Sequence, residues 1–102
     1  MGLLLYRSPI FPQEHELIWE LPRDVGLQDC EIQLWSGSTL LKREQRSFPN
    51  SPQSDWIQTL PLKPGEYQAE VFVHLDGGVA RHEHRTFRVD GAAPVRLPLL
   101  AR

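Results

Sequence analysis

Apolar and polar residues alternate over most of this chain, and turn-forming residues interrupt the alternation at short intervals. From Tyr67 to Leu75 every second residue is apolar, which is the period-2 pattern of a strand with one buried face. Asp76-Gly77-Gly78 follows, and the alternation resumes as far as Val89. The pattern therefore predicts a β-hairpin that begins after the Pro64-Gly65 turn.

The rest of the chain shows the same rhythm. Nine prolines and seven glycines divide it, so no run of about ten residues combines helical periodicity with freedom from these breakers. Seven or eight short antiparallel strands at a spacing of about 8 to 12 residues are typical of a β-sandwich with little or no helix. The expected strands are 17–21, 30–35, 40–48, 56–60, 67–75, 79–89 and 95–99, with an irregular or edge-strand segment over residues 1–13 and a loop over 49–54.

The apolar phase of these strands predicts the core. Cys30 shares the phase of its strand with Ile32 and Leu34, so we expect a small buried hydrophobe and not a reactive thiol. The other predicted core residues are Leu17, Trp19, Leu21, Leu62, Tyr67, Val71, Val73, Phe87, Val89 and Leu97.

Length and composition narrow the class of protein. With 102 residues, 40% hydrophobic and 24% charged, the chain is expected to be one globular domain over residues 1–102. Lys and Arg number 11 against 13 Asp and Glu. Apart from the short basic stretch of Lys42, Arg43 and Arg46, no positive field attracts nucleic acid, so a nucleic-acid partner is not expected.

Two further features bear on location. Cys30 is the only cysteine, so no disulfide can form within the chain. The apolar run Leu3–Tyr6 is too short for a signal peptide or for a membrane span of about 20 residues. We therefore expect a cytoplasmic protein without membrane insertion.

One short motif points to a family. Leu62-x-Pro64-Gly65-x-Tyr67, followed by alternating apolar residues, resembles the tyrosine corner of immunoglobulin-like and fibronectin type III domains, in which the Tyr hydroxyl bonds to upstream backbone. The motif is also similar to the entry of short immunoglobulin-like modules that decorate multidomain bacterial proteins. The resemblance implies a single immunoglobulin-like β-sandwich, without the paired core cysteines of antibody domains. It implies no particular function.

The histidines His74, His82 and His84 are the candidate metal ligands. A three-residue turn would place Leu75 opposite Val79 and Phe72 opposite His82, so that all three imidazoles and Glu70 share the face opposite Tyr67. Imidazoles with a carboxylate suit Zn or Fe, whereas a turn of two or four residues would move His82 and His84 to the other face.

The competing interpretation is a wet strand face that holds no metal. The H-x-H pair fails the cupin pattern, because Asp76, Arg88 and Val89 stand where cupins need Gly and Glu. Arg81, Glu83 and Arg85 interleave with the histidines, as suits an exposed hairpin. We therefore expect no metal and no cofactor.

The aromatic residues are the candidate binding residues. Trp19 is in phase with core neighbours, whereas Trp35 and Phe72 fall on the opposite phase of their strands. Aromatic side chains left outside a core often mark a contact surface. The predicted partner-binding residues are Trp35, Phe72 and, on the polar strand 40–48, Leu40 and Phe48.

These features favour a non-catalytic role. No nucleophile motif, phosphate loop or dinucleotide fingerprint occurs, and a sandwich of this size acts through its faces, edges or end loops. We expect a protein-interaction or structural module that binds a protein partner or itself through a sheet face or an edge strand such as 40–48 or 95–99. The alternatives are carbohydrate or small-ligand binding through exposed aromatics, and metal-dependent activity at the histidines.

Overall fold

The computed structural model describes residues 13–22, 26–48, 55–91 and 93–100. The described part contains seven strands, one 3₁₀ turn and no α-helix, which confirms the all-β prediction. The strands are β1 (Gln13–Glu20), β2 (Leu27–Ser36), β3 (Thr39–Ser47), β4 (Trp56–Leu62), β5 (Gly65–Leu75), β6 (Ala80–Val89) and β7 (Val95–Pro98). The N-terminal segment up to residue 12 and the loop at 49–54 lie outside the described residues, and Gln13 already belongs to β1.

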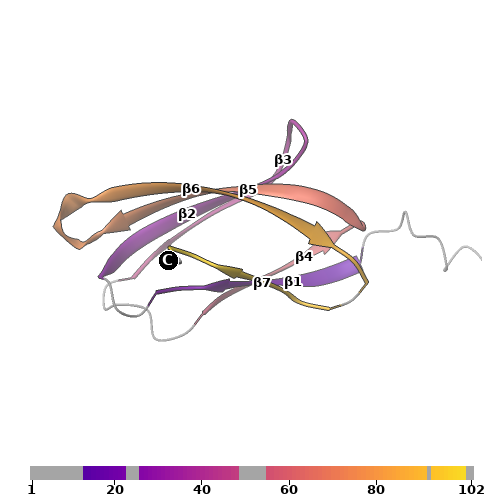
Figure 1. Cartoon of the computed structure of the whole chain (residues 1–102), viewed down its shortest axis with the longest axis horizontal. Coiled ribbons are helices and arrows are strands. Elements are labelled where there is room, and N and C mark those ends of the chain that lie inside the picture. The colour runs from indigo at the N-terminus through magenta and orange to yellow at the C-terminus, as the bar shows by residue number, and fades with distance from the viewer. Residues whose placement is uncertain (1–12, 23–25, 49–54, 92, 101–102) are drawn as a thin grey trace, which may run out of the picture.

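The strands form two sheets that face each other as layers (Figure 1). One has three strands in the order β4-β1-β7, and the other has four in the order β3-β2-β5-β6. All pairs are antiparallel except β1 with β7, which is parallel and differs from the antiparallel arrangement expected. The alternation of residues does not encode strand direction. Here the chain crosses from β6 in one sheet to β7 in the other, and β7 then runs alongside β1.

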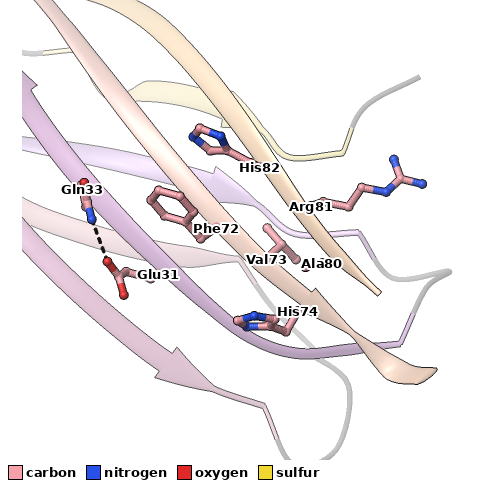
Figure 2. Close-up of a pocket in the computed structure, with 8 residues that line it drawn as sticks. All are labelled: Glu31, Gln33, Phe72, Val73, His74, Ala80, Arg81 and His82. Carbon is pink, nitrogen blue, oxygen red and sulfur yellow. Dashed lines mark hydrogen bonds between the residues drawn. The ribbon is translucent and has the colours of Figure 1, made fainter. Parts of the chain in front are cut away.

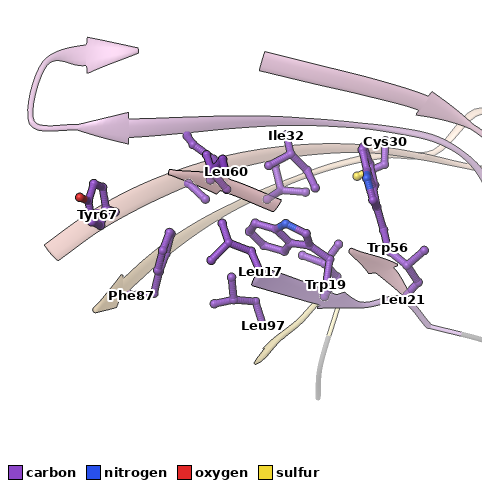
Figure 3. Close-up of a cluster of buried hydrophobic side chains, with 14 of the residues drawn as sticks. Leu17, Trp19, Leu21, Cys30, Ile32, Trp56, Leu60, Tyr67, Phe87 and Leu97 are labelled. Carbon is purple, nitrogen blue, oxygen red and sulfur yellow. The ribbon is translucent and has the colours of Figure 1, made fainter. Parts of the chain in front are cut away.

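The core lies between the two layers, where side chains of both sheets meet (Figure 3). Trp19 of β1 and Trp56 of β4 are its largest fully buried side chains. Every residue of the predicted core is buried, and Cys30 is fully buried as expected. Leu27, Trp56, Leu60, Ala69 and Leu99 complete the cluster.

The β5–β6 hairpin has the register expected from a three-residue turn. Phe72 pairs with His82, and the Leu75 amide donates to the Val79 carbonyl at 2.7 Å. Asp76–Gly78 forms the turn, with Gly77 at φ 85°. This left-handed backbone is one that glycine adopts at little cost. The turn thus places His82 and His84 on the side of the sheet that faces away from the core.

The strand β3 is the most exposed of the long strands. A register shift between Leu34 and Trp35 marks a β-bulge near its start, and the tip of the β2–β3 hairpin rises away from the layers in Figure 1. Leu40 and Leu41 near this tip are 44% and 42% exposed. In the described part of the chain, no helix is long and apolar enough to cross a membrane.

Candidate functional site

The side of the four-stranded sheet that faces away from the core carries most of the candidate residues. Along β2 and β5, buried positions alternate with half-buried or exposed ones, so every second side chain points away from the core. We call this surface the outer face. Its central residues are Asp29, Glu31, Gln33 and Trp35 of β2, Gln68, Glu70, Phe72 and His74 of β5, and His82 and His84 of β6.

A groove of about 390 Å³ lies on the outer face, toward the β5–β6 turn, and Phe72 is its main aromatic wall. The Phe72 ring stacks on the His82 ring, with centroids 4.5 Å apart and planes 4° apart. Figure 2 shows the two rings side by side on β5 and β6, with Glu31 and Gln33 on the β2 side. The remaining lining residues are Val73, His74, Ala80 and Arg81. A groove of this size and openness suits a partner's side chain or a small polar ligand better than an enclosed substrate.

Trp35 lies on the same face but not in the groove. It is half-buried, pairs with Leu40 across the β2–β3 ladder, and its indole Nε1 donates to the Gln33 side chain at 3.4 Å. Gln33 therefore lies between Trp35 and the groove. The structure places Trp35, Leu40 and Phe72 on one surface, but it does not bring the two aromatic rings into contact.

Phe48 lies elsewhere. It follows β3, is half-buried and packs against the core, where its ring meets Trp56 edge-on with centroids 6.3 Å apart. The sequence grouped Phe48 with the exposed aromatics because it ends a polar run. The structure gives this side chain a packing role at the rim of the core.

The three histidines each meet a carboxylate. Glu70 accepts hydrogen bonds from both His82 Nε2 and His84 Nδ1, the latter at 2.5 Å. The bonds from His84 and then His82 hold the pKa of Glu70 below its usual range. His74 pairs separately with Asp29, at 2.6 Å from Nδ1 to Oδ1. The expected sharing of one face is thus present, but the imidazoles divide into two groups.

This division bears on metal binding. Among the residues that the structure describes, no three His, Cys, Asp or Glu side chains are arranged to hold one metal ion. The Glu70 carboxylate uses one oxygen for each imidazole. The cluster is best described as a hydrogen-bonded, polar margin of the groove.

A second polar group ties β3 to the outer face. The Arg43 guanidinium contacts the Glu31 carboxylate at 2.9 and 3.3 Å, and the Gln33 amide donates to the same carboxylate at 2.8 Å. The Arg43 hydrogen bond, with a smaller contribution from Gln33, keeps the pKa of Glu31 below its usual range, and the same contact raises the pKa of Arg43. Glu31 is therefore an ionised, oriented acceptor beside the groove.

Two buried polar residues went unnoticed in the sequence. Gln58 is 3% exposed; its Oε1 accepts from Trp19 Nε1 and its Nε2 donates to Glu44, both at 2.8 Å. His15 is 2% exposed and contacts the carbonyls of Gln13 and Gly91. Each lies on the inward phase of its strand, which was the available signal. Both satisfy buried polar groups between elements, so their role is structural.

Cys30 offers no nucleophile. Burial, and then the nearby Asp29 charge, raise the pKa of its thiol to about 12. The thiolate, which is the reactive form, is therefore scarce near neutral pH.

No protein-family model, curated protein or solved structure matches this chain.

Proposed function

We propose that this protein is a non-catalytic, immunoglobulin-like interaction module that binds a protein partner, or a second copy of itself, through the outer face. The single observation that carries the proposal is the open groove of about 390 Å³ walled by the Phe72–His82 stack. A half-buried aromatic in a shallow groove, with polar groups around it, is the arrangement that contact hot spots favour.

The immunoglobulin-like part of the proposal rests on the tyrosine corner. The Tyr67 hydroxyl donates to the Lys63 carbonyl at 2.6 Å, four residues upstream. A hydroxyl-to-backbone bond of this kind is characteristic of immunoglobulin-like and fibronectin type III sandwiches. The two facing sheets of three and four strands are compatible with that architecture.

The absence of catalysis is supported by the chemistry of the outer face. A general acid or base works best with a pKa near the operating pH. Hydrogen bonds instead shift the pKa of Glu31 and Glu70 away from neutrality. Ionised carboxylates held by cations and imidazoles orient a partner, but they are poor proton donors.

The test uses the protein as bait on a solid support, with lysate of the source cell. Proteins captured by the wild type should be lost with Phe72→Ser and reduced with Trp35→Ser, because both substitutions remove an aromatic contact. Ile57→Ser is the matched control, since Ile57 is 55% exposed but lies on the three-stranded sheet. Sedimentation of the same four proteins tests self-association. Capture or self-association that survives Phe72→Ser contradicts the proposal.

Carbohydrate binding is the second candidate. The specific observation in its favour is that Glu31 and Gln33, which can accept and donate hydrogen bonds, line the groove beside the Phe72 ring. Titration with a sugar panel, followed by backbone NMR shifts at Phe72 and Gln33, separates this candidate from the first. Saturable shifts with one sugar, abolished by Phe72→Ser, would favour it over protein binding.

A further inference from the structure

The free edges of the two sheets are not equivalent. Among the described strands, the edges are β3 and β6 of one sheet and β4 and β7 of the other. Pro61 interrupts β4, while β7 has only four residues and includes Pro98. Both β3 and β6 place charges on the phase of the core residues, namely Lys42, Glu44 and Arg46 on β3 and Arg81, Glu83 and Arg85 on β6. On β6, however, Glu83 is already bonded to Arg85 and to the Leu100 amide. The nine residues of β3 contain neither Pro nor Gly.

The direction of the β3 backbone groups follows from one hydrogen bond. The Phe48 amide donates to the Gln28 carbonyl of β2 at 2.7 Å. The antiparallel register runs unbroken from Ser47 to Lys42, and in such a ladder successive residues point their N–H and C=O alternately toward and away from the partner. The backbone groups of Arg43, Gln45 and Ser47 therefore point away from β2, to the free side of the strand.

The charge along this edge is mainly positive. β3 carries Lys42, Arg43 and Arg46 against Glu44 alone, in a chain whose formal net charge is −2. The Glu44 carboxylate already accepts from Gln58 at 2.8 Å and lies 3.9 Å from Lys42. The edge thus contrasts with the chain as a whole.

Of the three cations of β3, Arg46 is the one without a carboxylate partner among the described residues. Its guanidinium lies over the Trp56 ring, 5.3 Å from the centroid. Within the described part of the chain it contacts no carboxylate that would neutralise it. An aromatic face holds a cation in place without cancelling its charge.

We propose that the free edge of β3 binds an acidic extended peptide, which adds to the four-stranded sheet as a further strand. The proposal rests on the proposed function and names the class of partner for the same sheet. The main chain of the peptide would bond to Arg43, Gln45 and Ser47, and its carboxylates would lie on the side of the strand that carries Lys42 and Arg46. Main-chain pairing provides the affinity and the alternating side chains provide the specificity.

A second copy of the chain is a poorer occupant of this edge. Two β3 edges would bring Lys42, Arg43 and Arg46 of each copy together, and like charges across a strand pair are destabilising. The same cations that favour an acidic strand therefore oppose edge-to-edge self-pairing.

The probe is a terminally blocked peptide of about seven residues, the length of an ordinary strand, in which Glu and Val alternate. Added to the 102-residue chain, it should slow amide hydrogen exchange at Arg43, Gln45 and Ser47. The amides of Glu44 and Arg46 already bond to β2 and should change little. A peptide with Lys in place of Glu should not bind.

Methylation of the peptide backbone separates strand pairing from simple charge attraction. The amides of an added strand point alternately toward β3 and toward solvent. N-methylation of the set that faces β3 should weaken binding about tenfold or more, whereas methylation of the other set should be tolerated. Equal effects of the two sets would overturn the proposal, and these peptides leave the protein itself unchanged.

Protein variants test the charge term. Lys42→Gln and Arg46→Gln should each weaken binding about two- to fivefold. Arg88→Gln on β6, at the other edge of the same sheet, is the matched control and should have no effect. The proposal is overturned by the absence of binding, by equal binding of the Lys peptide, or by slowed exchange outside β3. If partner capture still depends on Phe72 in that event, the proposed function stands and only the edge inference fails.

Discussion

Tyr67 joins two roles at a single residue. Its hydroxyl donates to the Lys63 carbonyl, and its ring, 7% exposed, stacks on Phe87 with centroids 5.8 Å apart. We expect Tyr67→Phe to lower the free energy of unfolding by about 0.5 to 1.5 kcal/mol, the net value of one hydrogen bond. Tyr67→Ala should cost about 3 to 5 kcal/mol because it also removes the buried ring. Urea melts measure both, and equal small losses would exclude the corner as a source of stability.

Gln58 is the residue for which a small change has the clearest predicted cost. Gln58→Leu replaces the amide by an apolar side chain of similar size and leaves the buried Trp19 Nε1 without its acceptor. An unsatisfied buried donor costs about 1 to 3 kcal/mol. The control is Glu44→Gln, which keeps an acceptor for the Gln58 amide at the half-buried end of the same chain of bonds. Thermal or urea unfolding should show a large loss for Gln58→Leu alone, and similar losses for both variants would contradict this explanation.

The residues show what alternation can and cannot predict. It located Tyr67 and Trp19 in the core, because burial on one face of a strand repeats every second residue. The same rule places Gln58 inward, yet a glutamine at such a position looks like an exception until its partners are known. Those partners are Trp19 on the neighbouring strand and Glu44 on the opposite sheet. The alternation within one strand does not predict which residues of the other sheet it will face.

At the scale of elements, Glu70 links β5 to β6 through its bonds from His84 and His82. Its pKa in the folded protein is held below the ordinary value of 4.5. A carboxyl whose pKa is depressed on folding contributes stability that is present above its unfolded pKa and is lost as the pH falls through the folded pKa. The contribution of Glu70 to stability should therefore be present at neutral pH and should be lost as the pH falls below about 4.5.

The matched experiment compares wild type with Glu70→Gln. The variant should be less stable at neutral pH and should lose less stability on acidification below pH 4.5, because one of the groups that binds a proton on unfolding is gone. Chemical melts at several pH values between neutrality and about pH 3 measure the difference. Parallel pH profiles for the two proteins would show that the Glu70 bonds do not contribute.

The strand pairings also differ in how well they could be predicted from the sequence. For the β5–β6 hairpin, the sequence left the length of the turn open, and the structure shows the register that was expected for a three-residue turn, with Phe72 paired to His82. The parallel pairing of β7 with β1 was not predicted, since it depends on how the chain crosses between sheets. The bulge between Leu34 and Trp35 also went unpredicted, because one extra residue in a polar edge strand leaves no mark in the alternation.

For the molecule as a whole, strand phase predicted which candidate residues share a face, but it did not predict the groove between them. Trp35, Phe72 and His82 share the outer face as their phase requires. Phe48 instead packs at the core rim, because it continues the phase of Glu44 and Arg46, which are paired with the core residues Ile32 and Cys30. The groove itself arises from three strands at once, and its volume depends on packing that no single segment determines.

The division between core and outer face predicts how stability is distributed through the whole molecule. Trp19 is fully buried between the layers, whereas Trp35 lies half-buried outside them. Trp19→Ala should cost about 3 to 5 kcal/mol, which would take most of the stability of a small domain. Trp35→Ser should cost about 1 kcal/mol or less, a shift in Tm of about 4 to 8 °C at most.

The informative comparison is between these two variants and Phe72→Ser in one set of thermal melts. Phe72→Ser removes the ring stack with His82, a contact worth about 0.5 to 1.5 kcal/mol. The Tm of this variant should therefore fall between those of Trp35→Ser and Trp19→Ala and lie closer to that of Trp35→Ser. If Phe72→Ser and Trp35→Ser unfold as readily as Trp19→Ala, both side chains belong to the core, and their exposure can no longer be explained by a partner. If instead both remain folded while partner capture is lost, stability and recognition occupy opposite sides of the same four-stranded sheet.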